Sequence, residues 1–346
     1  MRNVMNWIKN SLLVVISSGL ALITLEVGVR YIFPDTVLFN RFHSTVNYGQ
    51  FQSRTLMKNS EFKHTSKDGK FIFKTNSSGF RMTDEVHSEK DNDTLRVLIL
   101  GDSHTQGFEV QQNETFSALL NKKVCNGKVL EVINTGISGS GTSEHLITLQ
   151  HWAQILKPDV TIEAFYPNDL QNNMNAFHAI DNGELKVIRY KHPATTGIKL
   201  LEAHNSLWLL RFLSQNSYAY SLLMNFGWEY GKKLFYKSRH SENGEWVELN
   251  EAILHHDDLV LLNKLLQSMN EIMLPYGKFF IIPIPSINSY DIRNFLDVAM
   301  TEQLIDIEFS DGTVWHVPNG HRHINAAAHA HIASSIYSAL GCKAII

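Results

Sequence analysis

The sequence predicts an α/β fold in which a parallel β-sheet is covered by helices on both faces. Two observations lead to this prediction. From about residue 94 onward, short apolar segments of strand length alternate with longer segments of helix length. Several of the apolar segments run directly into polar or Gly-rich turns, as strands do in open α/β sheets. With 346 residues, of which 44% are hydrophobic, the chain is long enough for one large domain with extensions.

The main domain is expected to contain four strands and four helices. The strands are residues 97–100, 129–133, 160–165 and 279–282, and the helices are residues 114–124, 142–156, 259–274 and 325–340. Pro158 stops the second of these helices, because proline cannot continue a helix. Asp257 and Asp258 precede the third helix, where negative charge is favourable.

A long apolar segment lies at the N-terminus. Residues 11–25 carry no charge, basic residues precede them, and Glu26 and Arg30 follow one helical turn apart, where they can pair. A helix that continues two more turns reaches the about 20 residues that a bilayer span needs. We therefore interpret residues 1–34 as an uncleaved signal anchor with a cytoplasmic N-terminus, which places the rest of the chain in the periplasm or at the cell surface. The alternative is a buried helix of a soluble protein.

Two regions lie outside the alternating pattern. Residues 35–93 are polar with scattered aromatic side chains and form an extracytoplasmic extension in this interpretation. The main domain, 94–346, is interrupted at about 171–256 by an insertion rich in Trp, Tyr, Phe and His. The insertion is either a lid over a ligand site or a packing elaboration, which a surface tolerates at small entropic cost.

Charge and cysteine content exclude some functions. The net charge of −3 provides no electrostatic footprint for nucleic acid, so no nucleic-acid partner is expected. Cys125 and Cys342 are the only cysteines and have no metal-type spacing, although a single disulfide between them stays open.

Four polar signals stand at strand ends or before the last helix. Ser103 directly follows the first strand, as a nucleophile or as a helix cap. The Gly-rich turn at 134–142 presents free backbone N–H groups that can bind an anion. Asn168 follows the third strand, and its amide either donates to a developing oxyanion or forms an Asx-turn. His323 is placed for general-base work, with a capping or surface histidine as the alternative.

In this order the four signals resemble the SGNH, or GDSL-type, serine hydrolase family, which is named after these four residue types. The resemblance runs from Arg96 to about Leu340. Its matching blocks are Gly101-Asp102-Ser103, Gly139, Asn168-Asp169, and His323 with Asn325 and His329. The N-terminal anchor is similar to that of the membrane-anchored bacterial branch. The resemblance implies a three-layer, flavodoxin-like parallel sheet.

The resemblance also implies acyl transfer through a serine. Ser103 Oγ would attack an ester carbonyl while His323 takes its proton. The backbone N–H groups of Ser103 and Gly139 and the amide of Asn168 would hold the oxyanion. Residues expected to line the pocket are Asp102, His104 and Asp169; for His104 a structural role is equally open.

One departure from the family pattern concerns the acid that orients the catalytic histidine. The family usually has an Asp two or three residues earlier, where this chain has His321 and Gly320. A backbone carbonyl could hold His323 in a Ser-His dyad, a carboxylate from elsewhere could replace the acid, or the site could be weakened. His321 occupies the position of the orienting residue, and Asp311 and Asp306 are the nearest upstream carboxylates. We favour a working dyad.

The C-terminal histidines do not indicate a metal site. His329 and His331 are two residues apart on a predicted helix and point to different sides. Carboxylate and cysteine ligands are lacking beside them. We expect neither a metal nor another cofactor.

Together these observations predict an esterase that removes acyl groups, in particular O-acetyl groups, from an envelope or extracellular carbohydrate. The substrate follows from the family resemblance and the location, not from a residue that recognises a sugar. Two alternatives stay open. One is an O-acyltransferase that modifies an exported polysaccharide, with envelope polysaccharide machinery as its partner. The other is a catalytically weakened glycan-binding or assembly protein of the same fold.

Overall fold

The computed structural model describes residues 2–39, 41–173, 177–235, 256–287, 290–310, 312–319 and 323–342. The strands are β1 (His43–Tyr48), β2 (Phe51–Leu56), β3 (Glu61–Ser66), β4 (Gly69–Lys74), β5 (Thr94–Gly101), β6 (Val124–Cys125), β7 (Lys128–Asn134), β8 (Val160–Phe165), β9 (His178–Asp181), β10 (Glu184–Val187) and β11 (Lys278–Pro283). The α-helices are α1 (Arg2–Ile32), α2 (Ser103–Gln106), α3 (Phe116–Leu120), α4 (Thr142–Leu156), α5 (Asn168–Asn173), α6 (Thr195–Ser206), α7 (Trp208–Asn216), α8 (Tyr218–Phe235), α9 (His256–Met273), α10 (Val298–Thr301) and α11 (Ala326–Ala339).

The central sheet has the strand order β11-β8-β5-β7-β6. The first four of these strands are parallel, and the short β6 pairs antiparallel with β7 at the edge. In chain order the parallel strands follow the arrangement 2-1-3-4, which is the flavodoxin-like order. The predicted α/β fold with a parallel sheet is therefore confirmed, and its four predicted strands lie within β5, β7, β8 and β11.

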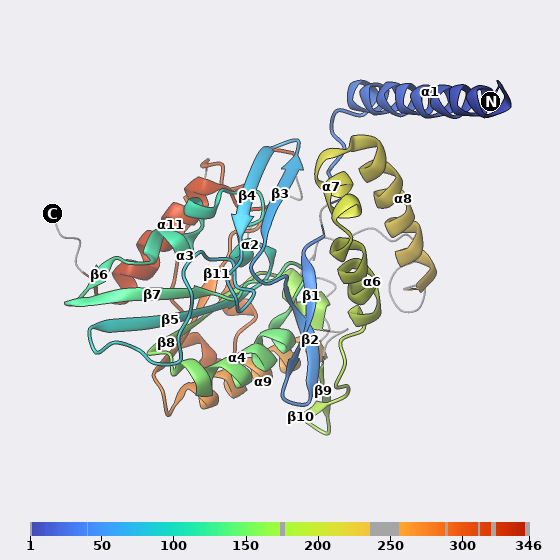
Figure 1. Cartoon of the computed structure of the whole chain (residues 1–346). Coiled ribbons are helices and arrows are strands. Elements are labelled where there is room, and N and C mark those ends of the chain that lie inside the picture. Colours follow the sequence, from blue (N-terminus) through green and yellow to red (C-terminus); the bar gives the residue numbers. More distant parts are fainter. Residues whose placement is uncertain are drawn as a thin grey trace.

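Each face of the sheet is covered by a separate layer of helices, as Figure 1 shows. Helices α4 and α9 cover one face, where Leu98 and Leu100 of β5 point. Helices α3 and α11 cover the other, where Val97 and Ile99 point. Both faces of β5 are buried because successive side chains of a strand point to opposite sides. The carboxyl ends of β5, β7 and β8 consequently meet at one edge of the sheet.

One predicted helix, 114–124, is wrong in its extent. A short 3₁₀ turn (Gln112–Glu114) is followed by α3, and the chain then enters β6. Thr115 caps α3 by accepting a hydrogen bond from the Ala118 N–H. Asn121 follows α3 with an extended ψ of 138°, which ends the helical run because helix residues need a negative ψ.

The N-terminal extension packs against the main domain as two β-hairpins, β1–β2 and β3–β4. The insertion contributes the hairpin β9–β10 and the helices α6, α7 and α8. It rests on the extension: Glu202 of α6 accepts hydrogen bonds from Ser44 Oγ and Thr45 N of β1. The segment 236–255 of the insertion lies outside the described residues.

Helix α1 is long and apolar enough to cross a membrane by its length and composition, from Val4 to Ile32, and this part is not buried in the protein. Glu26 and Arg30 form the predicted pair at 2.7 Å. At the far end of the domain, a disulfide joins Cys125 of β6 to Cys342, which follows α11.

Candidate active site

Ser103 lies at the carboxyl end of β5, as the first residue of α2. Asp102 caps this short helix, because its Oδ1 accepts the His104 N–H at 2.8 Å. A Cβ at Gly101 would overlap Thr105 Oγ1, so only glycine permits this close approach of strand and helix. The sharp turn leaves the Ser103 hydroxyl at the edge where the parallel strands end.

His323 reaches Ser103 from 220 residues away in the sequence. Its Nε2 lies 2.9 Å from Ser103 Oγ, within hydrogen-bond distance. His323 immediately precedes the turn into α11, and Asn325 caps that helix through the Ala328 N–H. The two side chains are shielded from bulk water, since Ser103 exposes 8% of its surface and His323 exposes 7%. A nucleophile and a base within hydrogen-bond reach form the core of an acyl-transfer site.

Glu109 supplies the carboxylate that sequence reasoning missed. Its Oε2 lies 3.4 Å from His323 Nδ1, the ring nitrogen opposite the one that faces Ser103. Glu109 is buried and adopts a left-handed conformation (φ 65°), which is uncommon for a residue other than glycine. Such backbone outliers concentrate at functional sites. The three side chains form a serine–histidine–carboxylate relay.

The environment of Glu109 favours its charged form. Burial by itself raises the pKa of the carboxyl, but the contacts with His323 and His64 outweigh it and lower the pKa well below 4.5. His64, from β3, lies on the other carboxylate oxygen, with 3.7 Å between Nε2 and Oε1. Glu109 is therefore ionised at neutral pH and faces an imidazole on each side.

Three other residues are sequence-based candidates for orienting His323. His321 and Asp311 lie outside the described residues. Asp306 is half exposed and forms an ion pair with Arg293. The carboxylate beside His323 is instead Glu109, only six residues after the serine.

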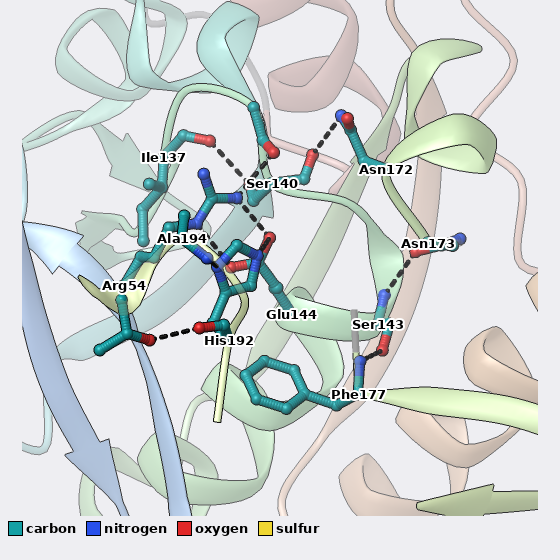
Figure 2. A network of polar contacts seen from close by, with 12 residues as sticks. Arg54, Ile137, Ser140, Ser143, Glu144, Asn172, Asn173, Phe177, His192 and Ala194 are labelled. Carbon is teal, nitrogen blue, oxygen red and sulfur yellow. Dashed lines mark hydrogen bonds and ion pairs between the residues drawn. The ribbon is translucent and has the colours of Figure 1, made fainter. Parts of the chain in front are cut away.

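A buried arginine holds the loop that follows β7 (Figure 2). Arg54 of β2 donates from Nη2 to the Gly139 carbonyl at 2.6 Å and pairs through Nε with Glu144 Oε1 at 2.9 Å. Gly139 has a left-handed backbone (φ 74°), which glycine adopts without strain. Ser140 Oγ donates to the Gly101 carbonyl at 3.2 Å, so the loop rests against the end of β5 beside Ser103.

Arg81 fastens a second loop, the one that carries Glu109. It donates from Nη1 to the Gln106 carbonyl and from Nη2 to the Val110 carbonyl, both at 2.8 Å. The guanidinium is almost completely buried, and this burial lowers the pKa of Arg81 to about 9. Residues 106–110 are thereby held from both ends by one side chain of the extension.

Asn168 and Asp169 lie at the end of β8, on the first turn of α5. The side chain of Asn168 is a hydrogen-bonding partner of Asp102, the residue before Ser103. Asp169 Oδ2 accepts the Tyr166 N–H at 3.1 Å. Burial, reinforced by the nearby charges of Asp102 and Glu163, raises the pKa of Asp169 well above 3.8. Burial likewise raises the pKa of Asp102.

His104 has a structural position. Its Nδ1 accepts the Ile324 N–H at 3.3 Å, next to His323, and its ring packs 4.1 Å from that of Tyr166. Burial, with the neighbouring His323 as a smaller cause, lowers the pKa of His104 well below 6.5, so its ring is neutral. His104 thus helps to hold the segment that carries His323.

Among the described residues, one buried group has the spacing of a metal site: His145, Glu163 and Asp169. Both ring nitrogens of His145 already have partners, however. Nδ1 lies 2.7 Å from Glu163 Oε1 and Nε2 lies 2.9 Å from Ser140 Oγ. A metal would have to displace one of these hydrogen bonds, and the network is complete for His145 without it.

The comparisons with known proteins concern the fold. No protein-family model matches the sequence, and no curated protein matches it. Three solved structures with a similar fold are TesA; LAE5, an alpha/beta hydrolase enzyme from the metagenome of Lake Arreo, Spain; and a catalytic mutant of Axe2, an acetylxylan esterase from Geobacillus stearothermophilus.

The similarity to each of the three is distant. TesA is 13% identical with a TM-score of 0.36, and the match covers 71% of this chain and 97% of that one. For LAE5 the values are 13%, 0.34, 71% and 95%. For the Axe2 mutant they are 14%, 0.32, 72% and 94%.

Proposed function

We propose that this chain is a serine esterase of the SGNH type that uses Ser103, His323 and Glu109. The observation that carries the proposal is the continuous chain of contacts from Ser103 Oγ through both nitrogens of His323 to Glu109 Oε2, at 2.9 and 3.4 Å. A buried serine hydroxyl in a purely structural role needs one partner. Here its partner is an imidazole that is itself oriented by a carboxylate, which is the arrangement that activates a serine.

The reaction would proceed in two steps, acylation of Ser103 and hydrolysis of the acyl-enzyme. Ser103 Oγ attacks the ester carbonyl carbon as His323 Nε2 takes the hydroxyl proton. The tetrahedral intermediate collapses, the bond to the leaving alcohol breaks, and His323 returns the proton to that alcohol. Water then attacks the acyl-enzyme with the same histidine as base, which releases a carboxylic acid and restores Ser103. Glu109 stabilises the imidazolium that forms in each step.

The oxyanion would be held by donors from three strand ends. These are the backbone N–H groups of Ser103 and Gly139 and the side-chain amide of Asn168. The support for Gly139 is the pair of contacts that press its loop against β5 and hold its carbonyl on Arg54. The loss of one such donor typically costs about 10²–10³ in rate.

The proposed location is supported by the disulfide and by helix α1. The Cys125–Cys342 disulfide fits an oxidising environment, and α1 fits a membrane anchor by length and composition. We therefore propose an anchored enzyme with an extracytoplasmic catalytic domain. It would remove O-acetyl groups from an envelope or extracellular carbohydrate and would work beside the polysaccharide machinery of the envelope.

An O-acyltransferase is the second candidate function, and the low solvent exposure of Ser103 and His323 supports it. An acyl-enzyme from which water is excluded survives until an alcohol acceptor arrives. Glu109, by contrast, argues against a catalytically weakened binding protein, because its carboxylate lies 3.4 Å from His323 Nδ1, where it would orient the ring.

The test uses the full chain in detergent and p-nitrophenyl acetate as substrate. We expect turnover and labelling of Ser103 by a fluorophosphonate, and both should be lost in Ser103→Ala. His323→Ala should lose turnover by several orders of magnitude while keeping the thermal unfolding midpoint. If the wild type turns over no faster than Ser103→Ala, the proposal fails. If p-nitrophenol release rises only when a sugar alcohol is added, with acetylated sugar as product, the transferase is favoured.

A further inference from the structure

The insertion helices α7 and α8 lie next to the end of α1 (Figure 1), and they carry a set of exposed apolar side chains. The exposed fraction ranges from 49% for Leu209 to 77% for Trp208. We call this set the α7–α8 apolar surface, and its members are Leu207, Trp208, Leu209, Phe212, Leu223, Phe226 and Tyr230. Exposed apolar residues in single positions are ordinary, but a set concentrated on two helices that contact each other indicates an interaction site.

Helix α8 shows that the surface is not a by-product of packing. The side of α8 that faces the rest of the protein already has hydrogen-bond partners. Ser221 Oγ accepts the Phe39 N–H at 2.9 Å, and Asn225 Nδ2 donates to the Val37 carbonyl at 2.7 Å. The opposite side carries Leu223, Phe226 and Tyr230, which expose 68%, 74% and 59%. A solvent-facing helix side normally carries charged residues, yet Glu229 is the only charge between residues 218 and 231.

The end of α1 is fastened to the junction between α7 and α8. The Glu26 carboxylate accepts hydrogen bonds from Ser217 Oγ at 2.7 Å, Tyr218 N at 2.9 Å and Ala219 N at 3.1 Å. A carboxylate there satisfies the free N–H groups of the first turn of α8 and complements its dipole. Glu26 therefore acts as the cap of a helix that lies about 190 residues further along the chain.

Arg30 completes the attachment from the other side of the junction. It donates from Nη2 to the Asn216 carbonyl at the end of α7, at 2.7 Å, and lies 4.7 Å above the Tyr218 ring. A cation at a helix C-terminus is favourable for the same reason as an anion at an N-terminus. With both contacts, the point at which α1 leaves its apolar run is fixed to one place on the catalytic domain.

The apolar surface begins within about 10 Å of that point, measured along α7 and α8. Phe212 precedes Asn216 by four residues and Leu223 follows Ser217 by six, which is about 6 and 9 Å along the helices at 1.5 Å per residue. The interfacial region of a bilayer extends for about 5–8 Å beyond the hydrocarbon core on each side. A surface fastened so close to the exit of a spanning helix lies within reach of the lipid headgroups.

We infer that the α7–α8 apolar surface rests in the interfacial layer of the bilayer that α1 spans. The inference rests on the proposed anchoring role of α1. Trp208 and Tyr230 have the amphipathic rings that are enriched at membrane interfaces, and the leucine and phenylalanine side chains would enter the acyl boundary. Glu26 and Arg30 then hold the domain in one orientation toward the membrane instead of leaving it on a tether.

The experiment measures lipid contact of single labelled positions in the full chain. The chain is reconstituted in nanodiscs of phosphatidylcholine and phosphatidylglycerol, and an environment-sensitive fluorophore is attached to Phe212→Cys or Leu223→Cys. Because Cys125 and Cys342 are joined in a disulfide, the introduced thiol alone reacts. Val298→Cys, on the 83% exposed Val298 of α10, is the matched control, and Val15→Cys reports on α1 itself. Each variant must keep the wild-type thermal unfolding midpoint.

We expect nitroxide lipids labelled near the headgroup to remove most of the fluorescence at 212 and 223 and none at 298. Lipids labelled in mid-chain should quench position 15. If position 15 is quenched while 212 and 223 behave like 298, the docking inference is overturned and the anchor stands. An apolar emission at 212 and 223 without lipid quenching also overturns it, in favour of a second copy or another protein on this surface. If position 15 is not quenched, the proposed anchor itself fails.

Discussion

Replacing Glu109 by glutamine tests the relay most directly. The substitution keeps the size of the side chain and its ability to accept a hydrogen bond from His323 Nδ1, but it removes the negative charge. The change should therefore act on the imidazolium that forms during catalysis and much less on binding of a neutral ester. A lowered kcat with a nearly unchanged KM is the expected pattern, because the lost interaction exists only in the transition state.

The size of the effect follows from the geometry. At the 3.4 Å between His323 Nδ1 and Glu109 Oε2, and with an effective dielectric constant of about 20, the attraction between opposite charges is about 5 kcal/mol. If all of it were lost, kcat would fall by about 10³–10⁴-fold. The amide retains part of the orienting hydrogen bond, so we expect a fall of about 10³-fold.

The assay is steady-state hydrolysis of p-nitrophenyl acetate together with the rate of fluorophosphonate labelling at Ser103. Glu61→Gln is the matched control, because Glu61 is an exposed glutamate of β3 that pairs with Lys74 outside the relay. Glu109→Asp should recover part of the activity by restoring the charge. If Glu109→Gln keeps kcat within about threefold of the wild type and of Glu61→Gln, a difference of less than about 0.7 kcal/mol, the carboxylate does not assist His323 and the dyad interpretation returns.

Three further predictions concern two supports of the site and the disulfide. Arg54→Lys should lower kcat by about tenfold with little change in KM, because lysine cannot hold both the Gly139 carbonyl and Glu144. This fall in kcat is smaller than the fall expected for the loss of a whole oxyanion donor. Stopped-flow measurement of the acylation rate checks the prediction. Burial raises the pKa of Glu144, but Arg54 outweighs it and lowers that pKa from 4.5 to about 2. The charged carboxylate thus stabilises the fold above pH 4.5, where Glu144→Gln should lower the free energy of unfolding by about 3 kcal/mol. In urea unfolding, the difference between the variant and the wild type should vanish as the pH falls toward 2. Changing Cys125 and Cys342 together to alanine should lower the free energy of unfolding by about 2–5 kcal/mol. Ser103→Ala should leave the unfolding midpoint unchanged and serves as the control. Equal stability of the reduced and the oxidised wild type would contradict the prediction.

The sequence was sufficient to predict the sheet, because the strand and helix patterns are local. Strand β5 and the serine after it, for example, are visible within a dozen residues. Glu109 could not be found in this way. It lies 214 residues from His323, and no spacing rule joins the two positions. The one available signal was a carboxylate in the turn that follows the serine helix, and a surface loop residue would look the same. Helix 114–124 was overestimated for a related reason: its residues favour a helix, but the pairing of β6 with β7 reverses the chain after α3.

The N-terminal extension contributes to the proposed site, although its sequence is polar with scattered aromatic side chains and carries no catalytic motif. Three of its side chains support different parts of the site. His64 lies against the Glu109 carboxylate, Arg81 holds the loop on which Glu109 stands, and Arg54 holds the Gly139 carbonyl. A buried guanidinium is costly unless it finds acceptors, and both arginines donate to acceptors of the main domain. The extension also carries the chain from α1 to the sheet, so one segment joins the proposed anchor to the supports of the proposed relay.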